Sequence, residues 1–318
     1  MFSVGTYNIQ KPDASWQTRK EQLFENIRAA DLDVVSLQEV SDKPADREEM
    51  KQRFQALGYE ISTQTEKAGI TALGVIWKRE KFTLVRAFAG AYTNGADRKR
   101  CFAAVDLEDR ATKKIIRVAA VHLYTAPRDG TPHLGIPQLQ TFRRLLENES
   151  AHISRLIIAG DFNADPDREG DSDVLRVLSQ AQEGSAYAFQ TVEKNSQGEK
   201  IATKGRNKID WIFAGTAGAT SGLAPKVTPH PITIRYPHAS DHLLHAVDVH
   251  QEDIPTLVKQ LQECFRGRTS IVREDLIRAG LVKRETCNDT VSRWIRDGLI
   301  VQRGMGRDTK YFPVKLYG

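Results

Sequence analysis

The segment GDFNADP, at residues 160–166, holds the residue types with the clearest chemical potential in the sequence. An apolar run, RLIIAG, precedes it and predicts a buried strand that carries Asp161 and Asn163 to its carboxyl end. Residues two apart on a strand point the same way. The pair therefore predicts a site in which Asp161 takes a proton from water while Asn163 orients a phosphate oxygen. An Asp-x-Asn turn is common by itself, because both residues favour turns, so other parts of the chain must support this interpretation.

Polar residues also follow several other apolar runs, at positions where a buried strand has no structural reason to prefer them. One of them alone would be explained as a strand cap or as a histidine satisfied in the core. An ordered series of them along the chain is not explained in this way. The candidates are Asn8 after GTY, Gln38 and Glu39 after VVSL, His122 after VAAV, Asp210 in KIDWIF, and Ser240, Asp241 and His242 in an SDH triplet.

The motifs TYNI, QEV, VHL, GDFN, KIDWIF and SDH occur in the order found in one known family. Over residues 1 to about 250 the sequence resembles the endonuclease/exonuclease/phosphatase superfamily, which includes pancreatic-type deoxyribonucleases, AP-site endonucleases and sphingomyelinases. Together the motifs are highly specific for the superfamily and much less specific for the substrate. The resemblance implies a metal-dependent phosphodiester hydrolase.

The resemblance implies a metal site in which Glu39 is the main Mg²⁺ ligand and Asn8 and Asp241 lie near the ion. Oxygen ligands suit Mg²⁺, which is usually held by one or two carboxylates and keeps several waters. Mn²⁺ is an expected substitute in vitro because it accepts the same ligands. The alternative for Glu39 is a strand-end residue that caps the next helix.

The resemblance also assigns the catalytic groups. Asp161 would activate or position the water, and Asn163 would help bind the scissile phosphate. His242 would pair with Asp210, whose carboxylate fixes the tautomer and orientation of the ring beside that phosphate. A metal and cationic donors are needed because a phosphodiester is anionic and gains charge on its phosphoryl oxygens during the reaction.

His122 matches the histidine of the deoxyribonuclease branch, which donates to the phosphate or the leaving oxygen. Deoxyribonucleases supply an acidic partner for that histidine just before the strand that aligns with TALGVIW, and here Ile70 and Thr71 stand there. The alternative is a strand-end histidine that is hydrogen-bonded to the backbone.

The elements that must position these residues are many short apolar or alternating runs separated by Gly-, Pro- and Asp-rich turns. They predict an α/β fold, a four-layer sandwich of two packed mixed β-sheets flanked by helices, rather than a βαβ nucleotide fold. Helices are predicted at 18–30, 136–149 and 172–180. We place the end of this catalytic domain at residue 250, before the polar, proline-containing junction QEDIP.

Residues 251–318 predict a second, small domain with short helices followed by two strands around the Gly-rich turn at 304–306. This order resembles a winged helix-turn-helix. The segment carries 13 Lys and Arg against 9 Asp and Glu, so most of the formal net charge of +5 lies here. In a DNA-binding interpretation, side chains of the third helix face a groove and those of the wing hold phosphates. The basic candidates are Arg293, Arg296, Arg303, Arg307 and Lys310. The alternatives are a solvated basic face and a module for protein partners or self-association.

The expected function is that of a Mg²⁺-dependent DNA nuclease, with endonuclease activity favoured and double-stranded DNA as partner. The sequence has no apolar run long enough to cross a bilayer and no recognisable secretory signal, and its three cysteines are widely spaced. We therefore expect an intracellular, cytoplasmic protein that uses no membrane and no disulfide framework. The rivals are a phosphatase or phosphodiesterase acting on a substrate other than nucleic acid, and a DNA-binding regulator whose sandwich is inert.

Overall fold

The fold is known from a computed structural model of the 318-residue chain. The residues that it describes are 1–10, 15–64, 72–91, 101–124, 136, 139–140, 142, 153–168, 171–179, 187–195, 197, 199–205, 207–217, 227–232, 234–250, 263–266, 270–281, 291, 295, 300–303 and 309–313.

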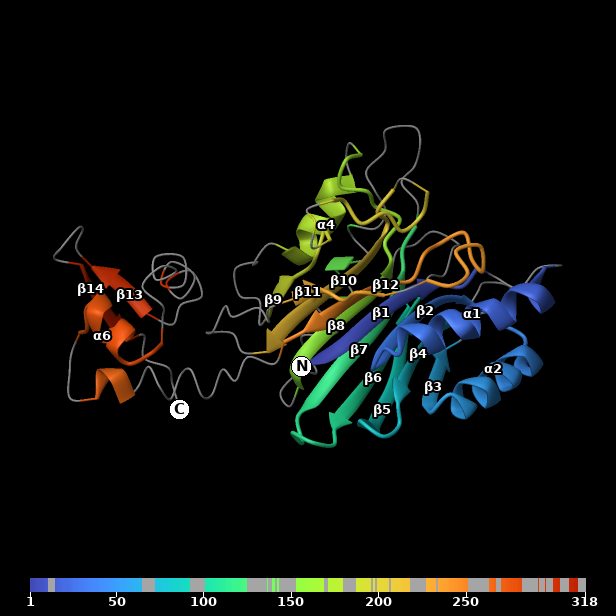
Figure 1. Cartoon of the computed structure of the whole chain (residues 1–318), viewed down its shortest axis with the longest axis horizontal. Coiled ribbons are helices and arrows are strands. Elements are labelled where there is room, and N and C mark those ends of the chain that lie inside the picture. Colours follow the sequence, from blue (N-terminus) through green and yellow to red (C-terminus); the bar gives the residue numbers. More distant parts are fainter. Residues whose placement is uncertain are drawn as a thin grey trace.

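Two six-stranded sheets form the centre of the predicted catalytic domain (Figure 1). The first contains, in spatial order, β11 (Val227–Pro229), β12 (His245–Val249), β1 (Phe2–Asn8), β2 (Val34–Val40), β4 (Ala72–Lys78) and β3 (Tyr59–Gln64). The second contains β5 (Phe82–Ala91), β6 (Cys101–Asp109), β7 (Ile115–His122), β8 (Ile153–Asp161), β10 (Asp210–Ala217) and β9 (Tyr187–Gln190). Each sheet has one parallel pair, β1 with β2 and β7 with β8, and its other pairs are antiparallel. The predicted mixed sheets are confirmed.

The two sheets pack face to face over a buried apolar layer that includes Val4, Val75, Val118, Ile157 and Ile212. Because both faces of the central strands are covered, β1 and β8 read as nearly continuous buried runs instead of alternating ones. β1 and β12 come first and last along the chain among the strands of the first sheet, and they are neighbours in it. Phe2 on β1 lies opposite Val249 on β12.

Helices cover the outer faces of the sandwich. α1 (Trp16–Ala30) and α2 (Pro44–Ala56) pack against the first sheet, and α4 (Asp171–Ser179) packs against the second. α1 and α4 confirm the helices predicted at 18–30 and 172–180, and the described residues of the predicted helix at 136–149 are helical. α2 has little apolar periodicity and was not predicted; it is anchored by Met50 and Phe54.

The described part of the C-terminal segment holds α6 (Arg273–Arg278), β13 (Ile300–Arg303) and β14 (Lys310–Pro313). The two strands pair antiparallel, as predicted. Six buried side chains pack together here: Phe265, Ile271, Leu276, Val291, Ile300 and Tyr311. The winged-helix fold and the boundary after residue 250 stay predictions, because residues 251–262, 282–290 and 304–308 lie outside the described residues.

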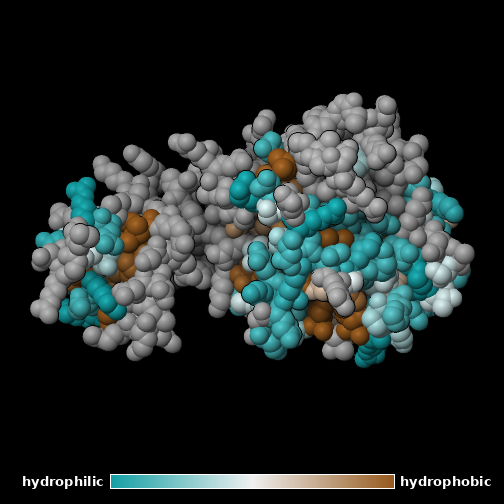
Figure 2. All heavy atoms as spheres, turned by 90° about the horizontal axis from the view of Figure 1, so that it is seen from above, coloured by the Kyte–Doolittle hydropathy of each residue, from teal (hydrophilic) through white to brown (hydrophobic). Residues whose placement is uncertain are grey.

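The surface is that of a largely polar protein where it is described. No helix in the described ranges is long and apolar enough to cross a membrane. The face drawn in Figure 2 is mostly hydrophilic over the described atoms, with a few separate apolar patches. Exposed apolar side chains on β5 include Leu84 and Val85.

Candidate active site

The predicted site residues meet at one end of the sandwich because their strands end there. His122 on β7 lies opposite Asp161 on the parallel strand β8, and Asp210 on β10 lies opposite Asp161 from the other side. Asn8 ends β1 in the other sheet, and its side-chain Nδ2 donates to Asp161 Oδ2 over 3.1 Å. The two sheets therefore contribute to a single cluster.

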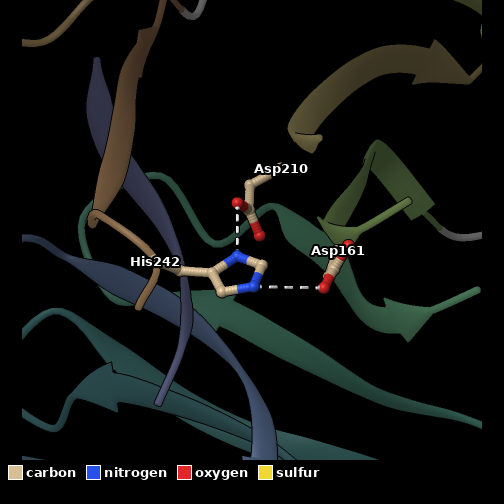
Figure 3. A group of neighbouring side chains, drawn as sticks. All are labelled: Asp161, Asp210 and His242. Atoms are coloured by element: carbon tan, nitrogen blue, oxygen red, sulfur yellow. Dashed lines mark hydrogen bonds and ion pairs between the residues drawn. The ribbon is translucent and has the colours of Figure 1, made fainter. Parts of the chain in front are cut away.

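His242 and Asp210 form the predicted dyad. The His242 Nδ1 and Asp210 Oδ2 atoms are 2.8 Å apart, and both side chains are almost completely buried. Figure 3 shows the imidazole between Asp210 and Asp161, with Nε2 at 3.7 Å from Asp161 Oδ2. Burial alone would lower the pKa of His242, but the hydrogen bond and charge of Asp210, with the charge of Asp161, outweigh it and raise the pKa. The ring is therefore fixed in orientation, with Nε2 on the side of Asp161.

Asp161 lies at the centre of the cluster and is buried. Its Oδ1 accepts the backbone N–H of Asn163 over 2.9 Å, and its Oδ2 accepts Asn8 Nδ2. Burial and the nearby charge of Asp210 raise the pKa of Asp161 to about 7, against the opposing effects of His242 and the two hydrogen bonds. A carboxylate with a pKa near neutrality has the proton affinity that a general base needs.

Glu39 reaches the cluster through a β-bulge. In the β2–β4 pairing, Leu37 lies opposite Gly74 and Val40 lies opposite Ala72, so two residues of β2 face one of β4. Glu39 has a left-handed backbone with φ of 59°, which is uncommon for a residue other than glycine. Bulges occur next to active sites, where they re-aim a side chain. Here Glu39 Oε1 accepts Asn8 Nδ2 over 3.0 Å.

Asn163 does not share the strand with Asp161, as the sequence-based argument assumed. β8 ends at Asp161, and Asn163 follows in a left-handed turn with φ of 50°. The strand periodicity therefore does not apply, because asparagine tolerates this conformation and ends the extended segment. Its Nδ2 donates to the carbonyl of Leu123 over 3.0 Å, so the amide is tied to the end of β7.

His122 is packed against Asp161, with Nε2 at 3.6 Å from Asp161 Oδ2. The close approach of β7 and β8 needs Gly160, because a Cβ there would lie 1.9 Å from the carbonyl oxygen of Val121. Asp161 is thus an acidic neighbour of His122. Ile70 and Thr71 lie outside the described residues.

Asp241 is half exposed at the mouth of the cluster. It is linked to Asn8 through Ser240, whose hydroxyl donates to the Asn8 carbonyl over 2.6 Å and accepts the backbone N–H of His242 over 3.2 Å. Burial would raise the pKa of Asp241, but the hydrogen bond from Lys204 and the charge of His242 lower it.

Lys204 is the residue of this cluster that sequence reasoning missed. Its Nζ lies 2.7 Å from Asp241 Oδ2 and 3.1 Å from His242 Nε2. Partial burial lowers its pKa, but Asp241, Asp161 and Glu39 outweigh this and raise it. The available signal was the turn TKGRN just before KIDWIF, which places a cation near Asp210.

Arg19 supports the site from α1. It is buried and donates to the carbonyls of Ile9, Gln10 and Ala239. These bonds join the chain after β1 to the loop that carries the SDH triplet.

The basic residues predicted to bind DNA lie in the C-terminal segment. Arg303 and Lys310 face each other on β13 and β14, whereas Arg293, Arg296 and Arg307 lie outside the described residues.

The donor set fits a divalent cation. One ligand atom from each of Asp161, Asp210 and His242 lies within 4.8 Å of the others. The Asp210–His242 hydrogen bond already uses two of these groups, whereas Glu39 and Asn8 offer the oxygen atoms that Mg²⁺ prefers. Four acidic side chains (Glu39, Asp161, Asp210 and Asp241) gather in this cluster with the ammonium of Lys204, and Lys208 lies near Asp210. The preponderance of acidic groups favours a bound cation.

The sequence matches the model of the Endonuclease/Exonuclease/phosphatase family over residues 5–242. The chain belongs to this family. Members of the Endonuclease/Exonuclease/phosphatase family hydrolyse phosphoester bonds and depend on divalent metals. The chain is thus a phosphoesterase of this family, and the cluster at residues 8–242 lies within the matched region.

Solved structures share the family fold. The human Nocturnin catalytic domain with bound sulfate anion has a TM-score of 0.60 and 21% identity, over 78% of this chain and 94% of that chain. ANGEL2, a 2',3'-cyclic phosphatase, has a TM-score of 0.59 and 18% identity, over 77% and 94%. The mannosyl-6-phosphatase of Bacteroides thetaiotaomicron VPI-5482 has a TM-score of 0.56 and 14% identity, over 79% and 100%. At these identities the likeness shows the fold alone. A search of curated protein sequences gave no match.

Proposed function

We propose that this member of the family is a Mg²⁺-dependent phosphodiester hydrolase that cleaves DNA, with endonuclease activity. One observation carries the catalytic part of this proposal. The Asp161 carboxylate contacts both the Asn8 side chain, which also binds Glu39, and the His242 ring, which is held by Asp210. A proton acceptor, an oxygen-rich cation site and an oriented imidazole thus lie within contact distance of one another.

Glu39, Asn8 and Asp241 would hold the cation, which supplies neutralisation of the charge that develops on the phosphoryl oxygens. Asp161 takes the proton of the attacking water, for which its raised pKa is suited. His242 presents Nε2 to the phosphate, and Asp210 keeps its tautomer and orientation. Asn163 and His122 lie beside Asp161, and we assign to them contacts with phosphate oxygens.

DNA as the substrate is supported by the C-terminal segment. Arg303 and Lys310 lie directly opposite each other across β13 and β14, so two basic side chains share one short ribbon. Such a ribbon suits contacts with phosphates, which position a protein on a duplex without reading its sequence. The sequence adds Arg293, Arg296 and Arg307 to this basic set. A role of the same segment in binding a protein or a second copy of the chain is the competing use of these residues.

A second candidate function is that of a phosphatase or phosphodiesterase acting on a substrate other than nucleic acid. ANGEL2 is described as a 2',3'-cyclic phosphatase, and the Bacteroides protein as a mannosyl-6-phosphatase. The fold therefore serves a 2',3'-cyclic phosphatase and a mannosyl-6-phosphatase in other proteins. The central groups named above serve either class, because both reactions transfer a phosphoryl group to water.

The test is a substrate panel with Mg²⁺ or with EDTA. It contains supercoiled plasmid, adenosine 2',3'-cyclic phosphate, mannose 6-phosphate and bis(4-nitrophenyl) phosphate. We expect Mg²⁺-dependent nicking of the plasmid that is lost in Asp161→Ala. Arg303→Ala with Lys310→Ala should weaken DNA binding most at low salt and make it less dependent on salt than in wild type. Turnover of the small phosphates without nicking would favour the second candidate. If no substrate is turned over in a metal-dependent way, the result would favour the third interpretation, a DNA-binding regulator whose sandwich is catalytically inert.

A further inference from the structure

Lys204 is held in place by a tight turn that also positions the dyad. Lys204 and Asn207 exchange two backbone hydrogen bonds, of 3.1 and 2.9 Å, and Gly205 between them has a φ of 58°. The preceding residue, Thr203, accepts the backbone N–H of Asp210 at its hydroxyl and the backbone N–H of Leu243 at its carbonyl. The backbone of Lys204 is therefore tied to both chain segments that carry the dyad.

The ammonium of Lys204 lies on the solvent side of the cluster. Its side chain is 44% exposed and that of Asp241 is 46% exposed, whereas His242 and Asp161 are only 1% and 3% exposed. A substrate phosphate that approaches His242 and Asp161 from solvent therefore meets this pair first. Among the described residues, Lys204 is the basic residue whose side chain contacts His242, the histidine of the dyad.

The present partners of Lys204 can be exchanged for a phosphate. The pair with Asp241 is half exposed, and exposed ion pairs are weak because water screens them. The contact with His242 Nε2 is a single one of 3.1 Å, to a ring that Asp210 already holds through Nδ1. A non-bridging phosphate oxygen is also a charged acceptor, so its hydrogen bond with the ammonium is charge-assisted and can replace these contacts.

We propose that Lys204 is a substrate-binding residue that contacts a non-bridging oxygen of the phosphate and leaves His242 Nε2 free to face the same phosphate. This inference rests on the proposed hydrolase function and adds a residue to it. An ammonium there offsets part of the repulsion between an anionic substrate and the four carboxylates of the site. The substrate class that it selects is a phosphate ester with unshielded non-bridging oxygens, whatever the alcohol.

The test compares wild type with Lys204→Met, Lys204→Arg and the matched control Lys113→Met. Lys113 pairs with Glu108 at the turn between β6 and β7, at the opposite end of β7 from His122. Isothermal titration calorimetry with inorganic phosphate in Mg²⁺ measures binding, and bis(4-nitrophenyl) phosphate gives kcat and KM. We expect Lys204→Met to weaken phosphate binding and raise KM by about tenfold, the size of one charge-assisted hydrogen bond, while kcat changes less. Lys204→Arg should stay within about threefold of wild type because it keeps the charge, and Lys113→Met should match wild type.

The outcomes separate this inference from the function on which it rests. Wild type that lacks any metal-dependent hydrolysis would overturn the proposed function, while calorimetry would still report the role of Lys204 in binding phosphate. Active wild type with a phosphate affinity that Lys204→Met changes by less than about twofold would overturn the inference, because one charge-assisted hydrogen bond is worth more. A fall in kcat at unchanged phosphate affinity would also overturn it, because Lys204 would then act through His242.

Discussion

The side-chain amide of Asn8 crosses from one sheet of the sandwich to the other and donates to Asp161 over 3.1 Å. The same nitrogen donates to Glu39 over 3.0 Å, so Asn8 sets the spacing of the two carboxylates. Replacing it with leucine, which has a similar volume and no polar atoms, should lower kcat/KM by about 100-fold, the usual effect of losing one oriented donor in an active site. Steady-state kinetics measure this, and circular dichroism should show an intact fold. Activity within a few-fold of wild type would contradict a bridging role for Asn8.

Asp210 and His242 should behave as one unit. Asp210→Asn leaves the shape but removes the charge that orients the ring, so we expect a loss in kcat of about 100-fold or more. His242→Ala should cost a similar factor, and the double variant should be no worse than the poorer single one, because members of one unit are not additive. Single-turnover kinetics of the three variants check this. Multiplying losses would mean that Asp210 acts independently of His242.

Glu39 is predicted to determine metal affinity. Glu39→Gln keeps the side-chain length and removes the charge, so the dissociation constant for Mn²⁺, used as the calorimetric probe, should rise by about tenfold or more. The control is Glu108→Gln, which removes an exposed carboxylate on β6 away from the site. Equal Mn²⁺ affinity in Glu39→Gln and wild type would move the metal to the cluster of Asp161, Asp210 and His242.

Gly160 should tolerate no side chain. A Cβ there would overlap the carbonyl of Val121, which is backbone of the neighbouring strand and cannot rotate away. Gly160→Ala should therefore lower the free energy of unfolding by about 3 kcal/mol or more, as overpacking does in rigid cores. The matched control is Gly74→Ala, whose Cβ would meet nothing closer than 3.5 Å and should cost about 1 kcal/mol or less. Urea unfolding of both variants measures the difference.

Burial of Lys208 should make the stability of the folded protein depend on pH. Lys208 is fully buried, with Nζ 3.4 Å from His245 Nε2 and 4.5 Å from the centre of the Trp211 ring. Burial lowers the pKa of Lys208 from 10.5 to about 7, despite the opposing charge of Asp210. Between these two values the unfolded chain binds a proton that the folded chain does not, so this lysine makes stability rise as pH increases from about 7 towards 10.5. Below pH 7 both states are protonated and its destabilising effect is constant.

Lys208→Met should remove that rise. The difference in the free energy of unfolding between Lys208→Met and wild type should be largest near pH 7 and should shrink by several kcal/mol, to order of magnitude, towards pH 10. Urea titrations at pH 7, 8, 9 and 10 measure it, with exposed Lys113→Met as the control for losing any lysine. A difference that does not vary with pH would show that the Lys208 pKa is not lowered by folding.

The sequence predicted the sandwich and the main site residues because both depend on local patterns. Apolar runs give strands, and polar residues such as Asn8, His122 and Asp161 stand at their ends. Glu39 was predicted as a site residue, but the bulge that aims it was not. The bulge exists only in the pairing of β2 with β4, and 31 residues separate Val40 at the end of β2 from Ala72 at the start of β4. The left-handed turn at Asn163 also replaced the expected strand geometry.

Lys204 was missed for a similar reason. Its sequence context is that of an exposed turn, and its significance depends on contacts with Asp241 and His242, which are more than 30 residues away in the chain. Composition and spacing do not encode such contacts. The basic residues of the C-terminal segment illustrate the opposite limit: their charge is evident from the sequence, but the choice between DNA and a protein partner depends on surface geometry that a charge count does not contain.

The pairing of β1 with β12 has a consequence for when the enzyme gains its activity during synthesis. Asn8 is made among the first residues, but its strand lies between β2 and β12, and His242 immediately precedes β12. A ribosome-bound chain that has not yet released residues up to about Val249 lacks both the covering strand and the dyad histidine. Contacts between such distant parts of a chain form late in folding. The complete site therefore forms only when almost the whole sandwich has been translated, because shorter nascent chains lack His242 and the strand that covers β1.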